Sequence, residues 1–182
     1  IHTDEHFMPQ SFKLNGYQTG MFGKWHLGHS QENFHPNQTG FDYFYGHLHT
    51  EVGYFSPFSN QGGIDFQRNG KTIDDKGYST FLLAEEASKW INSRDKDKPF
   101  FMYVPFLAPH TPLQAPEDLL QKYKHLKDTR KPTRNTEADK ARSNSQTLGS
   151  SARPAYAAVV DALDQAIGCL LYTSPSPRDM WT

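Results

Sequence analysis

A lysine and a histidine stand two residues apart in a glycine-flanked segment, residues 23–28, which reads Gly-Lys-Trp-His-Leu-Gly. The ammonium group of Lys24 is a compact charge on a flexible stem, so it can hold the oxygens of an anion. The imidazole of His26, with an ordinary pKa of about 6.5, can move a proton at neutral pH. The spacing therefore predicts a site that binds an anionic substrate and transfers a proton.

A second histidine, His110, lies in residues 108–114, which read Ala-Pro-His-Thr-Pro-Leu-Gln. The two prolines restrict the backbone around it. It follows the continuous apolar run of residues 100–104, which is typical of a strand buried on both faces. Residues 17–25 predict another strand, which delivers Lys24 and His26 at its carboxyl end. All three side chains are thus placed at strand ends, where open α/β sheets carry their functional groups.

Hydrophobic periodicity and turn residues predict the elements that position these strands. Helices are expected at residues 7–15, 79–92 and 156–168, and an Asn-Gly pair predicts a hairpin turn within residues 65–71. A helix followed by a buried strand suggests a β-α-β unit. The expected fold class is therefore α/β, with a mixed or parallel sheet flanked by helices.

The last two of these helices have recognisable faces. In residues 79–92 the helical spacing leaves three charged side chains for solvent, Glu85, Glu86 and Lys89. In residues 156–168 five apolar side chains are spaced along one helical face: Tyr156, Val159, Val160, Leu163 and Ile167.

Two segments lack such periodicity. Residues 31–59 are rich in aromatic residues, histidine, glycine and proline, so we expect a long structured loop beside the site. Residues 121–153 are polar and carry both charges, which predicts a short helix start followed by a surface insertion. A nucleic-acid-binding arm is the alternative for this segment, but acidic residues interrupt it and no stacking aromatic residues accompany it.

The composition fits one domain of moderate size. The chain has 182 residues, of which 36% are hydrophobic and 14% aromatic, enough to build a core. A formal net charge of -1 gives no reason to expect a nucleic acid or an anionic membrane as partner. No stretch approaches the ~18 to 20 apolar residues that a membrane span needs.

Four further histidines, in or near the predicted loop, raise the question of a metal site: His29, His35, His47 and His49. No regular ligand pair with a partner cysteine or glutamate accompanies them. We therefore expect these histidines to line the loop or face solvent, and we assign no metal ligand in this chain.

Asn37-Gln38-Thr39 forms a glycosylation sequon, which predicts a glycan on Asn37 and a secreted or lysosomal protein. The amino terminus has no initiator methionine and none of the basic and apolar regions of a signal peptide, which predicts an internal start within a longer chain.

The two motifs, together with residues 40–46, Gly-Phe-Asp-Tyr-Phe-Tyr-Gly, resemble the sulfatase family and in particular its arylsulfatase B-like branch. The resemblance implies an alkaline-phosphatase-like domain that hydrolyses sulfate esters of sugars or aryl alcohols. It implies that Lys24 contacts the sulfate, that His26 hydrogen-bonds a formylglycine nucleophile and helps to release sulfate, and that His110 contacts the ester on the leaving-group side. Calcium is the implied cofactor, and a sulfated small molecule or glycan is the implied partner.

The chain departs from the family pattern in two respects. It has no Cys-x-Pro-Ser-Arg motif, from which formylglycine is made, and it lacks the Asp-Asp and Asp-Asn pairs that bind calcium. The resemblance covers roughly residues 8–168, so we expect the nucleophile and the calcium ligands outside this fragment, which alone should be inactive. A phosphodiester or phosphonate hydrolase of the same superfamily and a non-catalytic homologue are the alternatives. Oligomeric state stays open.

The carboxyl end does not resemble a domain end. Residues 169–179, Cys-Leu-Leu-Tyr-Thr-Ser-Pro-Ser-Pro-Arg-Asp, match a translation of the transposase adapter used in DNA sequencing libraries. We therefore expect a partial sulfatase catalytic domain over residues 1–168 and non-native sequence over residues 169–182. A genuine Ser/Pro-rich tail is the alternative.

Overall fold

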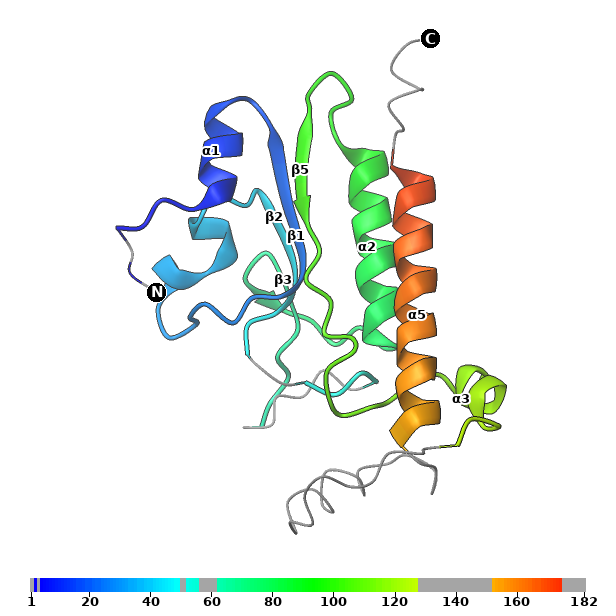
Figure 1. The fold of residues 1–182 in the computed structure, drawn as a ribbon. Helices are drawn as coiled ribbons and strands as arrows, with labels where there is room; N and C mark the ends of the chain where they lie inside the picture. The colour runs from blue at the N-terminus through cyan, green and yellow to red at the C-terminus, as the bar shows by residue number, and fades with distance from the viewer. Residues whose placement is uncertain (1, 3, 50–51, 56–61, 128–151, 175–182) are drawn as a thin grey trace.

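The computed structural model describes residues 2, 4–49, 52–55, 62–127 and 152–174 (Figure 1). Within them lies one five-stranded sheet of order β4-β3-β2-β1-β5. The central strand β1 (Gln18–Lys24) pairs in parallel with β2 (Tyr43–His47) on one side and with β5 (Phe100–Tyr103) on the other. The short strands β3 (Gln67–Arg68) and β4 (Lys71–Thr72) add an antiparallel hairpin beyond β2. The predicted α/β class is confirmed.

Helices cover both faces of this sheet. α1 (Met8–Leu14) lies on one side, and α2 (Ser79–Ser93) and α5 (Ala152–Thr173) run alongside each other on the other side (Figure 1). α3 (Glu117–Tyr123) packs against α5, and two 3-10 turns, Glu32–Phe34 and Pro36–Gln38, precede β2. The three predicted helices are confirmed, the last of them extending to Thr173. The hairpin turn is also confirmed, with φ of 49° at Asn69 and 78° at Gly70.

The alternation of side chains along β1 and β2 assigns their residues to the two faces. Met21 and Phe44 pack with Phe7 on the α1 side. Phe22 and Tyr45 pack instead into the cluster that includes helix residues of α2 and α5. Because paired residues in a parallel sheet share a face, the two strands present the same face at each register position. This alternation decides where the polar residues at the strand ends project.

Strand β2 corrects the prediction of an unbroken loop over residues 31–59, of which 50–51 and 56–59 lie outside the described residues. Residues 43–47, Tyr-Phe-Tyr-Gly-His, are buried between β1 and β3, with only Tyr43 partly exposed. A strand covered on both faces needs no polar alternation, so the period-2 signal is missing and only its aromatic content favours a strand.

Strand β5 also differs from expectation, which was burial on both faces. Phe100, Phe101 and Met102 are partly buried, while Tyr103 is 48% exposed. β5 is the last strand on its side of the described sheet, so its apolar run has neighbours on one edge only.

The apolar face predicted for α5 is buried only in part. Val159 is fully buried and Leu163 packs against the core, whereas Tyr156, Val160 and Ile167 are exposed. The fully or nearly fully buried set is Ala155, Ala158, Val159, Ala162, Ala166 and Leu170. Small side chains let two elements approach closely, and a closely packed interface has no room for water.

Glu86 of α2 was expected to face solvent but is buried. Its carboxylate accepts hydrogen bonds from the Arg68 guanidinium at 2.6 Å and from the Tyr43 hydroxyl at 2.5 Å. These bonds tie α2 to β3 and β2. They also hold the pKa of the carboxyl below its ordinary value, against the opposing effect of burial.

Among the described residues, α5 is long and apolar enough to cross a membrane over Arg153–Thr173, with a mean hydropathy of 1.2. Core helices of globular domains pass the same test, and the alanine face of α5 packs against α2 and α3. The most polar part of residues 121–153 cannot be compared with its prediction, because 128–151 lie outside the described residues.

Candidate active site

Lys24 and His26 lie at the carboxyl end of the central strand. Lys24 is the last residue of β1, and its backbone N–H donates to the carbonyl of Pro105, just beyond β5, at 2.9 Å. His26 donates its backbone N–H to the carbonyl of Leu48, just beyond β2, at 3.1 Å and takes a φ of 53°. A left-handed conformation is uncommon outside glycine, and here it turns an exposed imidazole away from the strand path.

Two glycines allow the three strand ends to come together. A Cβ atom at Gly46 would lie 2.0 Å from the carbonyl oxygen of Gly23, and one at Gly23 would lie 2.2 Å from that of Pro105. No real side chain fits at such distances. The close approach fixes the residues that follow these glycines, Lys24 and His47, beside each other.

His110 lies on the loop that follows β5, at the same edge of the sheet. Its backbone N–H donates to the carbonyl of Leu107 at 2.9 Å, and its exposed ring places Nδ1 2.6 Å from the carbonyl oxygen of Thr111. Because a carbonyl oxygen only accepts, Nδ1 carries the hydrogen and Nε2 is left for other groups. The bonds Ala108-Pro109 and Thr111-Pro112 are both cis.

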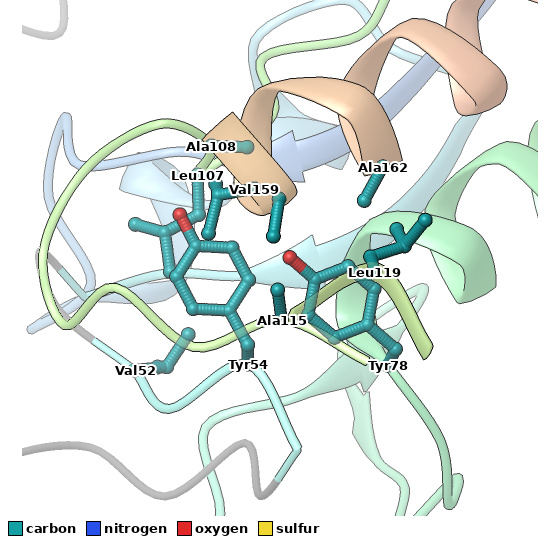
Figure 2. Close-up of a cluster of buried hydrophobic side chains, with 10 residues drawn as sticks. Val52, Tyr54, Tyr78, Leu107, Ala108, Ala115, Leu119, Val159 and Ala162 are labelled. Atoms are coloured by element: carbon teal, nitrogen blue, oxygen red, sulfur yellow. The ribbon is translucent and has the colours of Figure 1, made fainter. Parts of the chain in front are cut away.

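Tyr54 joins the loop after β2 to the loop that carries His110. Its hydroxyl donates to the His110 carbonyl at 2.9 Å, and its backbone N–H donates to the Gln114 side chain at 2.9 Å. Figure 2 shows the Tyr54 ring beside that of Tyr78, with its hydroxyl toward the Leu107–Ala108 segment; the ring centroids are 5.4 Å apart. The Tyr78 hydroxyl donates to the Gln114 carbonyl at 3.0 Å. Burial raises the pKa of this Tyr78 hydroxyl to about 12. Both phenols therefore stay protonated donors at neutral pH.

The surroundings of His26 lower its pKa. Desolvation is the largest cause, followed by electrostatic interactions with Lys24, His49 and His29. A histidine with a lowered pKa is unprotonated at pH 7 and can accept a proton. The Lys24 ammonium makes no hydrogen bond or ion pair with another described residue, so its charge is available to an anion.

The structure brings Lys24, His26 and His110 to one edge of the sheet, as the strand assignments predicted. Within the described ranges no hydrogen bond, ion pair or ring contact joins the His110 ring to the side chain of Lys24 or His26. The backbone supplies the link instead, because the loops after β1, β2 and β5 are hydrogen-bonded to one another.

The histidines expected to line a loop or face solvent divide into two groups. His29 is exposed, while His35 and His49 are half-buried; the His29 and His49 rings meet at 5.4 Å. His47 is 1% exposed, at the end of β2, so the prediction is wrong for this residue. One sequence feature could have predicted the position of His47. The pair Gly46-His47 follows apolar residues at the end of β2, just as Gly23-Lys24 does at the end of β1.

No group of three or more metal-ligating side chains lies among the described residues. The residues around Lys24 are one ammonium and several imidazoles, whereas calcium prefers carboxylate and carbonyl oxygens. The described side chains thus do not fit a calcium ion, and no step below depends on one.

Asn37 lies in the second 3-10 turn and is partly buried. Its side-chain amide donates to the carbonyl of Phe41 at 3.2 Å and to the side-chain oxygen of Asn69 at 3.3 Å. Attachment of a glycan to this nitrogen would require those bonds to break, and the glycosylation of Asn37 stays a prediction.

The chain belongs to the sulfatase family, whose model matches residues 1–173. The predicted family and the alkaline-phosphatase-like fold are confirmed; the arylsulfatase B-like branch stays a prediction.

The relatives are sulfatases from several organisms. Arylsulfatase J of Mus musculus is 33% identical over 68% of this chain, and an ulvan-active sulfatase of Formosa agariphila is 32% identical over 93%. The solved structure of Ps i-CgsB in complex with k-i-k-neocarrahexaose is 29% identical, with a TM-score of 0.75 over 95% of this chain. The chain spans 22%, 32% and 37% of these three proteins, respectively.

Proposed function

We propose that the complete protein is a sulfuric ester hydrolase. The observation that carries this proposal is the unpaired Lys24 ammonium beside the neutral imidazole of His26, on the central strand of a sulfatase-family sheet. Ester hydrolysis at sulfur needs a cation for the sulfate oxygens, a proton acceptor and a proton donor for the departing alcohol. Lys24, His26 and His110 supply these three functions.

Each residue has a role that suits its environment. Lys24 binds the sulfate oxygens as a point charge and does so more strongly as the negative charge on them grows. His26, neutral at pH 7, accepts a hydrogen bond from the formylglycine hydroxyl and takes up its proton as sulfate is released. His110, when protonated, keeps its Nδ1 hydrogen on Thr111 and gives the Nε2 proton to the leaving oxygen. A formylglycine from a segment outside this chain would supply the nucleophile, and we propose calcium as the cofactor, with all of its ligands outside this chain.

We further propose a sulfated glycan as substrate, in preference to a small aryl sulfate. The relatives support this preference by their names, which include ulvan-active sulfatase and N-acetylglucosamine-6-O-sulfatase, and one solved relative is complexed with a neocarrahexaose.

The test uses the complete protein that contains these residues. Sulfate release from ulvan, carrageenan and an aryl sulfate is measured for the wild type, Lys24→Met, His26→Ala and His110→Ala. We expect each variant to lose at least about a hundredfold in kcat/KM, or roughly 2.7 kcal/mol. Lys13→Met, at an exposed ion pair with Asp42 away from the site, is the matched control and should stay within about twofold.

The same assay distinguishes the alternatives. Hydrolysis of a phosphodiester in preference to every sulfate ester would identify the phosphodiester or phosphonate hydrolase, because the same cation and imidazoles also suit phosphate. A protein that binds sulfated glycans but hydrolyses none would be the non-catalytic homologue.

The proposed route of the protein is secretory or lysosomal. If so, expression in a glycosylating secretory host should place one glycan on Asn37, removable by a glycosidase and absent from Asn37→Gln. An unmodified Asn37 peptide in the mass spectrum would remove the support that the sequon gives.

We also propose that native sulfatase sequence ends near Gly168 and that residues 169–182 are adapter translation. Resequencing the source gene decides the matter, since a natural reading frame through Cys169 would disprove it.

A further inference from the structure

His47 occupies the position next to Lys24 in the sheet. It is the last residue of β2, and its Cα is the register partner of the Lys24 Cα. Two residues earlier on each strand, Phe22 and Tyr45 project into the core on the α2 side. Lys24 and His47 follow them with a period of two, so both side chains project from the same face, about 4.8 Å apart at the backbone.

The hydrogen bonding of His47 defines which of its nitrogens is free. Nδ1 lies 3.0 Å from the carbonyl oxygen of His49, so Nδ1 carries the hydrogen and Nε2 presents a lone pair. Nε2 is buried and has no hydrogen-bond partner among the described residues. An unpartnered buried acceptor destabilises the fold, so a native structure normally retains one only where it has a use.

The groups around this ring keep it neutral. Burial, the Lys24 ammonium from β1 and His49 from the loop after β2 lower the pKa of His47, while Asp65, before β3, and the bond to the His49 carbonyl raise it. The net result is a pKa of about 4. Asp65 itself is engaged by the backbone N–H groups of Leu48 and His49, at 3.0 Å and 2.7 Å, and so holds the loop that buries the ring.

We propose that His47 is a positioning residue for Lys24: its Nε2 accepts one hydrogen bond from the Lys24 ammonium and directs the remaining N–H donors to the anion. In the structure neither atom has a hydrogen-bond partner among the described residues. The bond forms when the flexible four-carbon stem of Lys24 turns the ammonium toward the ring. A carboxylate in this place would bind the lysine more tightly but would cancel its charge. A neutral imidazole orients the cation and leaves its full positive charge for the substrate.

The hydrogen bond is tested without reference to activity. The complete protein is labelled with 15N at histidine, and the His47 resonances are assigned by their loss in His47→Gln. We expect an Nδ1–H tautomer at pH 7, and we expect the Nε2 resonance to move in Lys24→Met but not in Lys13→Met. A resonance unchanged by Lys24→Met, or a hydrogen on Nε2, overturns the proposal.

The consequence for catalysis rests on the proposed function and has a second test. His47→Phe fills the same space without an acceptor, whereas His47→Gln retains one. We expect His47→Phe to lower kcat/KM about tenfold through a higher KM, the loss of about one hydrogen bond, and His47→Gln to stay within about threefold. Equal activity in His47→Phe and the wild type would contradict the role.

Two controls separate the possible failures. Thermal unfolding of both His47 variants shows whether a loss of activity reflects misfolding, in which case the 15N experiment on Lys24→Met decides alone. If the wild-type protein hydrolyses no sulfate ester, the proposed function fails, while the 15N result still decides whether His47 accepts from Lys24.

Discussion

Replacing Tyr54 by phenylalanine should reduce activity by removing a hydrogen bond to the backbone of His110, although Tyr54 itself is not expected to contact the substrate. The change removes the hydroxyl that donates to the His110 carbonyl at 2.9 Å and keeps the ring, which is 1% exposed, in its stack with Tyr78. The backbone bond from Tyr54 to Gln114 is kept as well. The substitution therefore loosens one anchor of the His110 loop without creating a cavity.

The magnitude follows from the geometry of that bond. A neutral hydrogen bond of this length contributes about 1 kcal/mol to stability. His110 is exposed, so water can bond to its carbonyl once the Tyr54 hydroxyl is gone, and the larger penalty for a buried acceptor without a partner does not arise. We expect the melting temperature to fall by roughly 2 to 4 °C. Because misplaced catalytic groups cost more in rate than in stability, we expect kcat/KM to fall about tenfold.

Tyr78→Phe is the matched control for this experiment. It removes a buried hydroxyl of the same aromatic pair, but one that donates to the Gln114 carbonyl at 3.0 Å, farther along the loop. We expect the same loss of stability and a change in kcat/KM of no more than about twofold. Sulfate release by the complete protein is the assay. Equal losses of activity in the two variants, or full activity in Tyr54→Phe, would refute the reasoning.

Two further substitutions test the scaffold, by denaturant unfolding. Gly46→Ala should destabilise the protein by about 3 kcal/mol or more, because its Cβ would lie 2.0 Å from the Gly23 carbonyl oxygen; wild-type stability would show that the strand ends are not closely packed. Glu86→Gln should cost about 1 to 2 kcal/mol at pH 7 by weakening the bonds from Arg68 and Tyr43. The folded-state pKa of Glu86 is lowered from 4.5, so the stabilisation by its carboxylate is complete above pH 4.5 and is lost as the pH falls through the folded-state pKa. The difference in unfolding free energy between the wild type and Glu86→Gln should therefore be smaller at pH 3 than at pH 7. The same difference at both pH values would contradict the assignment.

The sequence predicted elements whose signals are local. The helix at residues 79–92 is amphipathic, and the hairpin turn at Asn69 and Gly70 needs the positive φ that these residues tolerate. The ends of β1 and β5 were predicted to within one residue: β1 ends at Lys24, one residue before the predicted end, and β5 ends at Tyr103, one residue before the end of the apolar run that Pro105 stops. The positions of Lys24, His26 and His110 follow from those ends.

The features that were missed depend on partners far along the chain. β2 is a strand because β1 and β3 lie on either side of it, and nothing within residues 43–47 encodes those neighbours. His47 is buried for the same reason. The buried face of α5 follows from what packs against it: Ala158 and Ala162 lie in one cluster with Tyr54, while the larger Tyr156 and Val160 are exposed. Residue hydrophobicity alone cannot show which face approaches another helix.

The central place of β1 has a consequence for folding. Its two parallel partners come from distant parts of the chain, since Gln18 pairs with Phe100 and Lys24 with His47. Pairings of such sequence separation form slowly, because long loops must close before any contact is gained. The three strand ends therefore assemble only when β5 docks, late in folding. During refolding, activity should therefore recover later than helix content, at the rate at which β5 pairs with β1.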